Sequence, residues 1–163
     1  MNSFLWVPIL SILAVLTIRW FSNRRLAEKG TPIAVDDPLM LEAYAKARAS
    51  LDTLRELVAA SNEAAVKFPL PNAAREIEHV WGDVVSIDAD RVSARIVTPL
   101  IEGPTPDAPV DVSLADVEDW QVTLEDGRIR GGFTTRAQIA IARREGYHIP
   151  RAILAQETHF IDP

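Results

Sequence analysis

The chain has 163 residues, a length that suits one globular domain with appendages, and its 48% hydrophobic and 25% charged residues argue against extensive disorder. It has no cysteine, which excludes disulfides and thiolate zinc sites. The net charge is −6; three of the 17 basic residues and none of the 23 acidic residues lie in residues 1–25, so the remaining chain is the more acidic part. An acidic protein of this kind is a poor nucleic-acid binder, because phosphate contacts need a cationic surface.

Residues 1–21 are predicted to be a single-pass transmembrane anchor in the lipid bilayer. Residues 1–18 contain no charged side chain and include ten Phe, Leu, Ile and Val residues. As a helix this run is about 27 Å long, close to the ~30 Å hydrocarbon core of a bilayer. A cleaved signal peptide would have basic residues before the apolar run, whereas here three arginines follow it within residues 19–25. By the positive-inside rule these arginines place the rest of the chain in the cytoplasm, which predicts a protein of the cell inner (cytoplasmic) membrane.

A long amphipathic helix is expected over about residues 38–66. Asp37 is a favourable N-cap, and Pro38 suits the first helical position. Apolar side chains then recur at three- and four-residue spacing at Leu41, Tyr44, Ala47, Leu51, Leu54, Val58 and Ala65. This stripe either packs on the rest of the domain or joins a second copy of the chain in a coiled-coil homodimer.

Beyond this helix the hydrophobic period changes to two, which predicts a sheet over about residues 75–133. Residues 75–87 are predicted to form a strand with a β-bulge near Gly82. A second strand follows at 91–98. Residues 99–109 contain four prolines and one glycine, so an irregular loop is expected there.

Residues 118–133 are predicted to form a β-hairpin around Asp126-Gly127, the preferred sequence of a two-residue type I′ turn. The pairs that this turn would place on one face are Leu124 with Ile129, Val122 with Gly131, and Trp120 with Phe133. A shared face is what a hydrophobic core requires. The hairpin is therefore interpreted mainly as structural scaffold.

The final helix is predicted over about residues 135–145. Thr135 and Gln138 form a plausible capping box, and Gly146 is a natural C-terminal stop. One more short helix is expected in the tail, residues 147–163.

These elements predict an α+β fold with an N-terminal transmembrane helix, a long amphipathic helix, a small, mainly antiparallel β-sheet and a C-terminal helix. A barrel-like closure of the sheet is the alternative to an open one. The predicted divisions are the anchor at residues 1–21, a linker at 22–36 and a cytoplasmic α+β domain at 37–163.

Three short motifs follow one another in the second half of the chain. They are EHVW at 78–81, DVEDW at 116–120 and DGRIRGGFTTR at 126–136. As a set in this order they resemble the YegJ-like bacterial family called domain of unknown function 2314. The resemblance covers roughly residues 40–145. It implies a small α+β domain without an established activity, so it supplies no catalytic residue.

His79 is the histidine that lies in a predicted strand, and it is the candidate general base. Its neighbour Glu78 would point to the opposite face of the strand, so a carboxylate partner would have to be Asp83 or Asp119. The alternative is a hydrogen-bonded structural histidine. Because the sequence has no His-Glu-x-x-His, Walker or Gly-x-Gly-x-x-Gly motif, no metal and no cofactor is predicted.

A second candidate site is an acidic and aromatic recognition patch for a protein partner with a basic surface. Its residues are Trp81, Asp116, Glu118, Asp119 and Trp120. In the alternative reading, Asp119 accepts backbone N–H bonds and Trp120 belongs to the core.

Three functions remain open on this basis. The first is a non-enzymatic, membrane-tethered binding or regulatory module. The second is a hydrolase of unrecognised type that uses His79 with a nearby carboxylate. The third is an antitoxin-like protein whose acidic face masks a basic partner.

Overall fold

A computed structural model describes residues 33–60 and 63–162. The helices in this part are α2 (Pro38–Ala49), α3 (Leu51–Ala59), the short 3-10 helix η1 (Leu114–Asp116), α4 (Phe133–Glu145) and α5 (Arg151–Glu157). The strands are β1 (Glu63–Pro71), β2 (Ile77–Ile87), β3 (Arg91–Ile96), β4 (Val110–Ser113), β5 (Asp119–Thr123), β6 (Ile129–Gly131) and β7 (Phe160–Ile161). The predicted anchor at residues 1–21 lies outside the described residues. Between residues 33 and 162, leaving out 61–62, no helix combines the length and the apolar character needed to cross a bilayer.

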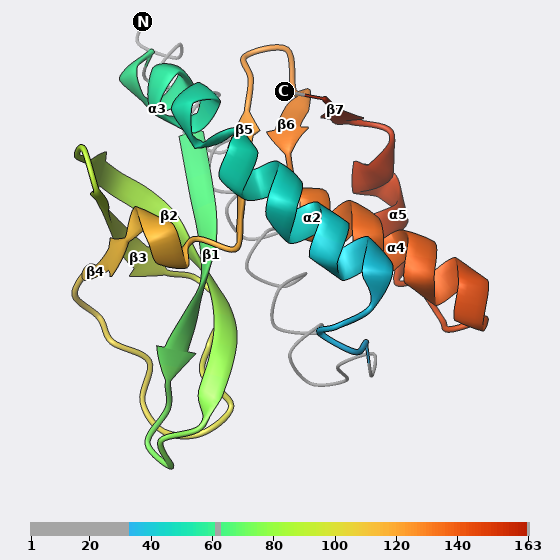
Figure 1. Cartoon of the computed structure of the whole chain (residues 1–163), viewed down its shortest axis with the longest axis horizontal. Coiled ribbons are helices and arrows are strands. Elements are labelled where there is room, and N and C mark those ends of the chain that lie inside the picture. Colours follow the sequence, from blue (N-terminus) through green and yellow to red (C-terminus); the bar gives the residue numbers. More distant parts are fainter. Residues whose placement is uncertain (1–32, 61–62, 163) are drawn as a thin grey trace, which may run out of the picture.

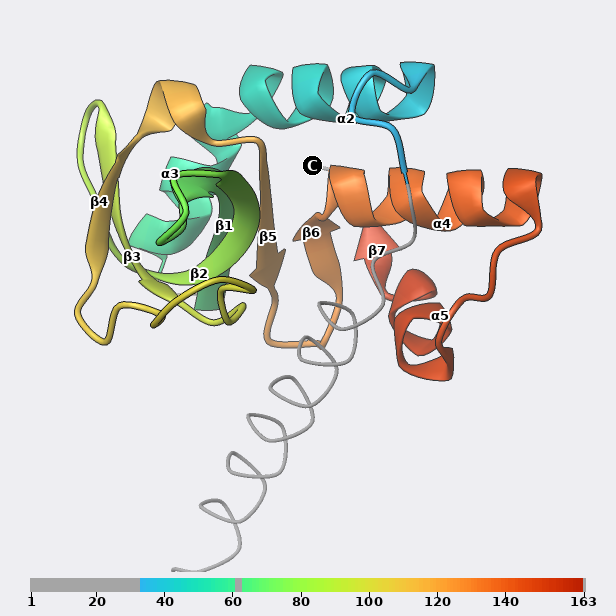
Figure 2. The ribbon, with the colours of Figure 1, turned by 90° about the horizontal axis from the view of Figure 1, so that it is seen from below.

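The strands form one open sheet in the order β4-β3-β2-β1-β5-β6-β7. Neighbouring strands are antiparallel except β6 and β7, which are parallel. The prediction of a mainly antiparallel α+β fold is therefore confirmed, whereas the sheet does not close into a barrel. Figure 2 shows α2 and α4 side by side, with β2, β3 and β4 at the opposite end of the domain from α4 and α5.

The hydrophobic core lies between one face of the sheet and the helices α2, α3 and α4. On α2, which contacts α4 and β5, the buried residues are Met40, Ala43 and Ala47. The apolar stripe of this helix thus packs within the chain, as one of the two readings expected. Leu41, which was assigned to the stripe, is instead 53% exposed.

The single helix predicted over residues 38–66 is wrong. The helical region is divided at Ser50 into α2 and α3. The Ser50 hydroxyl donates to the carbonyl oxygen of Lys46 at 2.8 Å, a bond to the preceding turn that often bends helices. From Glu63 onward the chain is extended as β1.

Strand β1 was missed because it lies in the middle of the sheet. All of its residues from Ala64 to Phe68 are buried, including Lys67, so both faces are covered and the sequence shows no regular alternation of apolar and polar residues. Its first residues, Glu-Ala-Ala, also favour helix intrinsically. Burial on both faces therefore removed the signal that identifies a strand.

The distal part of β1 pairs with β2 alone. The pairing with β5 stops at Lys67 opposite Asp119, while the pairing with β2 continues to Pro71 opposite Ile77. Past Lys67, β1 is an edge strand, which is where prolines are tolerated because no ladder N–H is needed. The β1–β2 ribbon therefore extends beyond β5, and the loop between β3 and β4 runs alongside it (Figure 1).

The predicted bulge in β2 exists but lies further along the strand. The β2–β3 register shifts between Val84 and Ser86, and the intervening Val85 is 56% exposed. Gly82 has a packing role instead, because a Cβ there would lie 3.1 Å from the Cβ of Ala94.

The β5–β6 hairpin has a longer turn than predicted. Leu124 N–H donates to the carbonyl oxygen of Arg128, and Gly127, at φ +81°, donates to that of Leu124. Such a three-residue loop with glycine in the left-handed region replaces the two-residue turn. The register consequently shifts by one, and Val122 pairs with Arg130 rather than with Gly131.

Helix α4 begins two residues earlier than predicted, at Phe133. Its N-cap is Gly132, which makes no side-chain cap bond, so Thr135 and Gln138 do not form the expected capping box. The stop at Gly146 is confirmed, with φ +73°. The expected short helix in the tail is α5.

Replacing Gly131 with alanine should destabilise the domain more than replacing Gly127. Both glycines have φ +81°, so alanine at either position should cost about 1–2 kcal/mol of backbone strain. At Gly131 a Cβ would also lie 2.2 Å from the carbonyl oxygen of Trp120, whereas at Gly127 nothing lies within 4 Å. We expect an additional loss of about 1–3 kcal/mol for Gly131→Ala, measured by chemical denaturation. Equal losses at the two positions would refute this packing argument.

Candidate functional site

Ionisable side chains from four elements gather at the start of β5. They are Tyr44 of α2, Lys67 of β1, His79 of β2, Asp119 of β5, and Glu118, which immediately precedes β5. The strand register explains the arrangement, because Lys67 lies opposite Asp119 and the Glu118 N–H donates to the Lys67 carbonyl oxygen. We call these five residues the ionisable cluster.

Asp119 is fully buried and caps helix α4 from the neighbouring strand. Its carboxylate accepts bonds from the backbone N–H groups of Trp120 at 2.8 Å, Phe133 at 3.1 Å and Thr134 at 2.7 Å, and from the Thr134 hydroxyl at 2.7 Å. It thereby satisfies donors at the first turn of α4 that lack partners within the helix. Burial raises the pKa of Asp119, while the bonds from Thr134 and Trp120 and the charge of Lys67 act in the opposite direction.

Trp120 is fully buried and joins the sheet to the bend between α2 and α3. Its indole N–H donates to the Ala47 carbonyl oxygen at 3.2 Å and to the Ser50 hydroxyl at 3.1 Å. Its ring meets that of Phe133 edge to face, with 5.8 Å between the ring centroids. Trp120 and Phe133 thus touch as expected, although Phe133 belongs to α4 and not to the partner strand.

The residues of the predicted recognition patch do not form one exposed surface. Asp119 and Trp120 have no exposed surface, so they serve the fold, as the alternative reading of the sequence held. Asp116 is exposed, and Trp81 and Glu118 are half-buried.

His79 contacts a carboxylate, but not one of those predicted. Its Nδ1 lies 2.7 Å from Oε2 and 2.9 Å from Oε1 of Glu118, and its side chain is 38% exposed. Asp83 and Asp119 were the expected partners. Glu118 takes the place expected of its neighbour Asp119, because the Asp119 carboxylate is bound to the first turn of α4. Glu118 approaches His79 through the pairing of β1 with both β2 and β5. A carboxylate on Nδ1 fixes the orientation and tautomer of an imidazole, which leaves Nε2 for a second contact.

Glu78 binds the backbone of the loop between β3 and β4. Its carboxylate accepts bonds from the backbone N–H of Ile101 at 2.8 Å and of Glu102 at 3.2 Å, and from the Asn72 amide at 2.9 Å. Partial burial opposes ionisation, but these three bonds prevail and hold the pKa of Glu78 below its usual value. The expectation that Glu78 and His79 act on opposite sides of the strand agrees with these contacts.

Residues of all three sequence motifs thus have defined structural contacts: Glu78 with the loop between β3 and β4, His79 with Glu118, and Asp119 with the first turn of α4. The family model described as "Uncharacterized protein conserved in bacteria (DUF2314)" matches residues 37–147. The chain belongs to this family. A search of curated proteins and a search of solved structures each found no match.

Lys67 is the unusual member of the cluster within this DUF2314 domain. The residue is 6% exposed, and burial lowers the pKa of its ammonium group, with the charges of Glu118 and Asp119 acting in the opposite direction. Sequence analysis missed Lys67 because β1 was not recognised as a strand.

Replacing Lys67 with methionine should stabilise the protein at neutral pH. Methionine keeps the shape of the stem and removes a charge that burial disfavours, so we expect a gain of about 1–2 kcal/mol in the free energy of unfolding. The ammonium holds its proton to a higher pH in the unfolded chain than in the folded one, so wild-type stability rises with pH in that interval. The advantage of methionine should therefore shrink as the pH becomes alkaline. Lys46→Met is the control, because the side chain of Lys46 is 59% exposed; a similar gain there would contradict the argument.

Tyr44 lies over the same carboxylates from the helical side. Burial, followed by the negative charges of Glu118 and Asp119, raises the pKa of its hydroxyl. The cluster thus combines a phenol, an ammonium, an imidazole and two carboxylates at a place that is partly shielded from solvent. Within residues 33–60 and 63–162, no three side chains of metal-binding type are gathered as a metal site.

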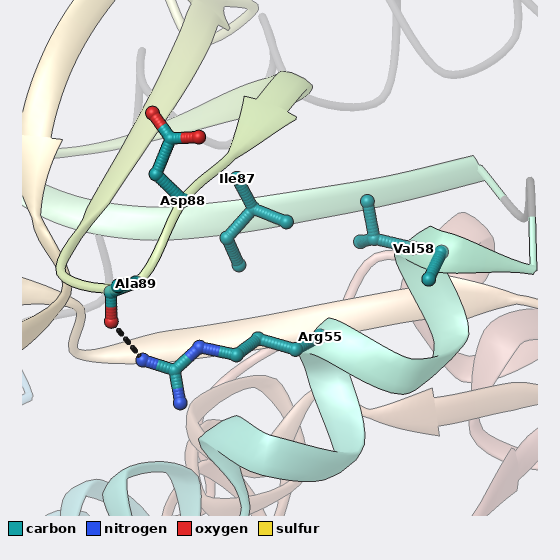
Figure 3. A pocket seen from close by; sticks show the side chains of 6 residues that line it. Arg55, Val58, Ile87, Asp88 and Ala89 are labelled. Atoms are coloured by element: carbon teal, nitrogen blue, oxygen red, sulfur yellow. Dashed lines mark hydrogen bonds between the residues drawn. The ribbon is translucent and has the colours of Figure 1, made fainter.

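An open groove of about 450 Å³ lies apart from the cluster, between α3 and the turn that joins β2 and β3. It is lined by Arg55, Val58, Ala59, Ile87, Asp88 and Ala89. Figure 3 shows the Arg55 side chain crossing it to donate to the carbonyl oxygen of Ala89. No residue of the three family motifs lines this groove.

Proposed function

We propose that the chain is a membrane-tethered, non-enzymatic binding module for a protein with a basic surface. The support comes from the distribution of charge over the fold. Residues 72–118 contain 10 acidic residues and 3 arginines, and they form β2, β3, β4 and the long loop at one end of the domain (Figure 2). We call this part the acidic lobe.

The remainder of the domain differs in its charge balance. Residues 33–71 contain six acidic and four basic residues, and residues 119–162 contain six of each. Several of these charges are paired within the chain, as in Arg136 with Asp162 and Arg143 with Glu157. A lobe with a large negative net charge beside a nearly neutral helical layer steers an oppositely charged protein and fixes its orientation.

Affinity capture with the full-length chain from detergent-solubilised cells tests this proposal. One triple variant neutralises the exposed acids Glu102, Asp107 and Asp111 of the lobe as amides. A matched variant neutralises the exposed acids Asp36, Glu56 and Glu125 outside it. We expect the first variant alone to lose a captured protein that binds more weakly as salt is raised. Equal loss of the captured protein in both variants, or capture that does not weaken as the salt concentration is raised, would contradict the proposal.

Acid–base catalysis by His79 is the second candidate. The contact of its Nδ1 with Glu118 supports it, because a carboxylate-oriented imidazole can transfer protons through Nε2. Hydrolysis of generic ester or phosphoester substrates that is abolished in His79→Gln, with stability retained, would favour this candidate over binding.

The anchor proposal rests on the uncharged residues 1–18 and the arginines that follow them. We expect the full-length protein to stay in the membrane pellet during alkaline carbonate extraction, while residues 35–163 alone should be released. A reporter that needs the cytoplasm should be active when fused after Pro163. Recovery of the intact full-length protein in the soluble fraction would overturn this prediction.

A further inference from the structure

One face of the β1–β2 ribbon carries apolar and aromatic side chains outward. Residues directly opposite in antiparallel strands share a face, and the register pairs Pro71 with Ile77, Pro69 with His79 and Lys67 with Trp81. We call the five outer residues Pro69, Pro71, Ile77, His79 and Trp81 the ribbon face.

The ribbon face is accessible in the folded chain. Ile77 is 57% exposed, Pro71 and His79 are exposed, and Pro69 and Trp81 are half-buried. An isolated exposed isoleucine is ordinary, but a strip in which two prolines, an isoleucine and a tryptophan adjoin one another is typical of a binding surface. Tryptophan in particular is enriched among the residues that dominate binding energy.

The other sides of the ribbon are less suited to a partner. On the opposite face, Glu78 binds the backbone of Ile101 and Glu102, so the loop between β3 and β4 occupies that side. Along the free edge of β1, Pro69 and Pro71 have no N–H to donate, which disfavours the addition of a partner strand. A partner must therefore pack on the side chains of the ribbon face.

The charge around the ribbon face selects the partner. Glu118, whose side chain is 14% exposed, borders it through the contact with His79, and the β2 residues of the face belong to the acidic lobe, which has seven more acidic than basic residues. The one cation that the register places on this face, Lys67 opposite Trp81, is buried. We propose that the ribbon face binds a basic, amphipathic segment of a partner protein, with apolar side chains on Ile77 and Trp81 and a lysine or arginine at Glu118. This inference rests on the proposed binding function and assigns it a surface and a partner chemistry.

Fluorescent synthetic peptides test this assignment on the full-length chain in neutral detergent, with empty micelles as a blank. One peptide alternates isoleucine with arginine, a second alternates serine with arginine, and a third alternates isoleucine with glutamate. We expect the first peptide to bind at least about tenfold more tightly than either of the others, measured by fluorescence anisotropy. Equal binding of the serine–arginine peptide would show a purely electrostatic contact and overturn the proposal, as would equal binding of the isoleucine–glutamate peptide.

Matched variants locate the site. Ile77→Ser and Glu118→Gln should each weaken binding of the isoleucine–arginine peptide about fivefold or more. Ile101→Ser, at a residue that is 73% exposed in the same lobe, and Glu125→Gln, at an exposed acid outside the lobe, should leave it unchanged. Equal effects of the paired variants would overturn the assignment.

Other occupants give distinct results. A dimer of the full-length chain that Ile77→Ser dissociates, seen by analytical ultracentrifugation, would assign the ribbon face to a second copy and overturn the proposal. Binding of the chain to anionic lipid vesicles that Ile77→Ser abolishes would likewise overturn it. If cellular capture depends on the lobe acids but not on Ile77, the binding function stands and the ribbon face does not.

Discussion

Trp120→Ala should lower the free energy of unfolding by about 3–5 kcal/mol, enough to unfold a domain of ordinary stability. The ring is fully buried, and its removal would leave a cavity between β5, the α2–α3 bend and Phe133. It would also leave the Ala47 carbonyl oxygen and the Ser50 hydroxyl without the indole donor. Thermal and chemical denaturation of the purified protein measure the effect.

Trp120→Phe separates packing from hydrogen bonding. Phenylalanine keeps most of the buried ring and loses the donor, so we expect a smaller loss, about 1–2 kcal/mol. If Trp120→Ala left the melting temperature unchanged and abolished capture of a partner instead, the residue would be an exposed anchor and the assignment to the core would be wrong.

Asp119→Ala should be about as damaging, with an expected loss of about 3–5 kcal/mol. The substitution leaves buried donors on Trp120, Phe133 and Thr134 without an acceptor, and such groups cost free energy when they are unpaired. Asp116→Ala is the neighbouring control; its side chain is exposed, so its effect should stay within about 0.5 kcal/mol. Similar losses for the two alanine variants would refute the capping role.

The pH dependence of Asp119 has a definite sign. Burial raises its pKa, so the folded protein holds this proton to a higher pH than the unfolded chain does. In that interval the folded state binds more protons, and its stability falls as the pH rises. Asp119→Asn removes the titration, so the difference in unfolding free energy between wild type and Asp119→Asn should be largest at acidic pH and should decline as the pH increases.

Local sequence signals predicted the parts of the fold that depend on neighbours along the chain. The Asp37 cap, the Gly146 stop and the existence of the β5–β6 hairpin each depend on a few adjacent residues, and all three are confirmed. The exact turn was not predicted, because Asp-Gly occurs in both two-residue and three-residue loops.

The central strand and the site could not be obtained in the same way. Strand β1 owes its conformation to neighbours on both sides, and its Glu-Ala-Ala start favours helix when it is considered alone. Strand β1 brings His79 close to Glu118 and places Lys67 opposite Asp119. Because the sequence analysis did not predict this strand, it could not predict the ionisable cluster. The individual residues His79, Glu118 and Asp119 were nonetheless selected by their chemistry.

The place of β1 between β2 and β5 has a consequence for how the chain folds. Strands β1 to β4 follow one another along the chain and in the sheet, so they can assemble as soon as they are synthesised. The other edge of β1 stays unpaired until β5 has been synthesised, because Glu63 of β1 pairs with Thr123 of β5. Helix α2 is made earlier than α4 and β5, the helix and strand that it contacts, so its apolar residues stay uncovered until those two elements emerge. During synthesis, we therefore expect the apolar surface of this protein to be most exposed to aggregation in the interval before residue 119 emerges.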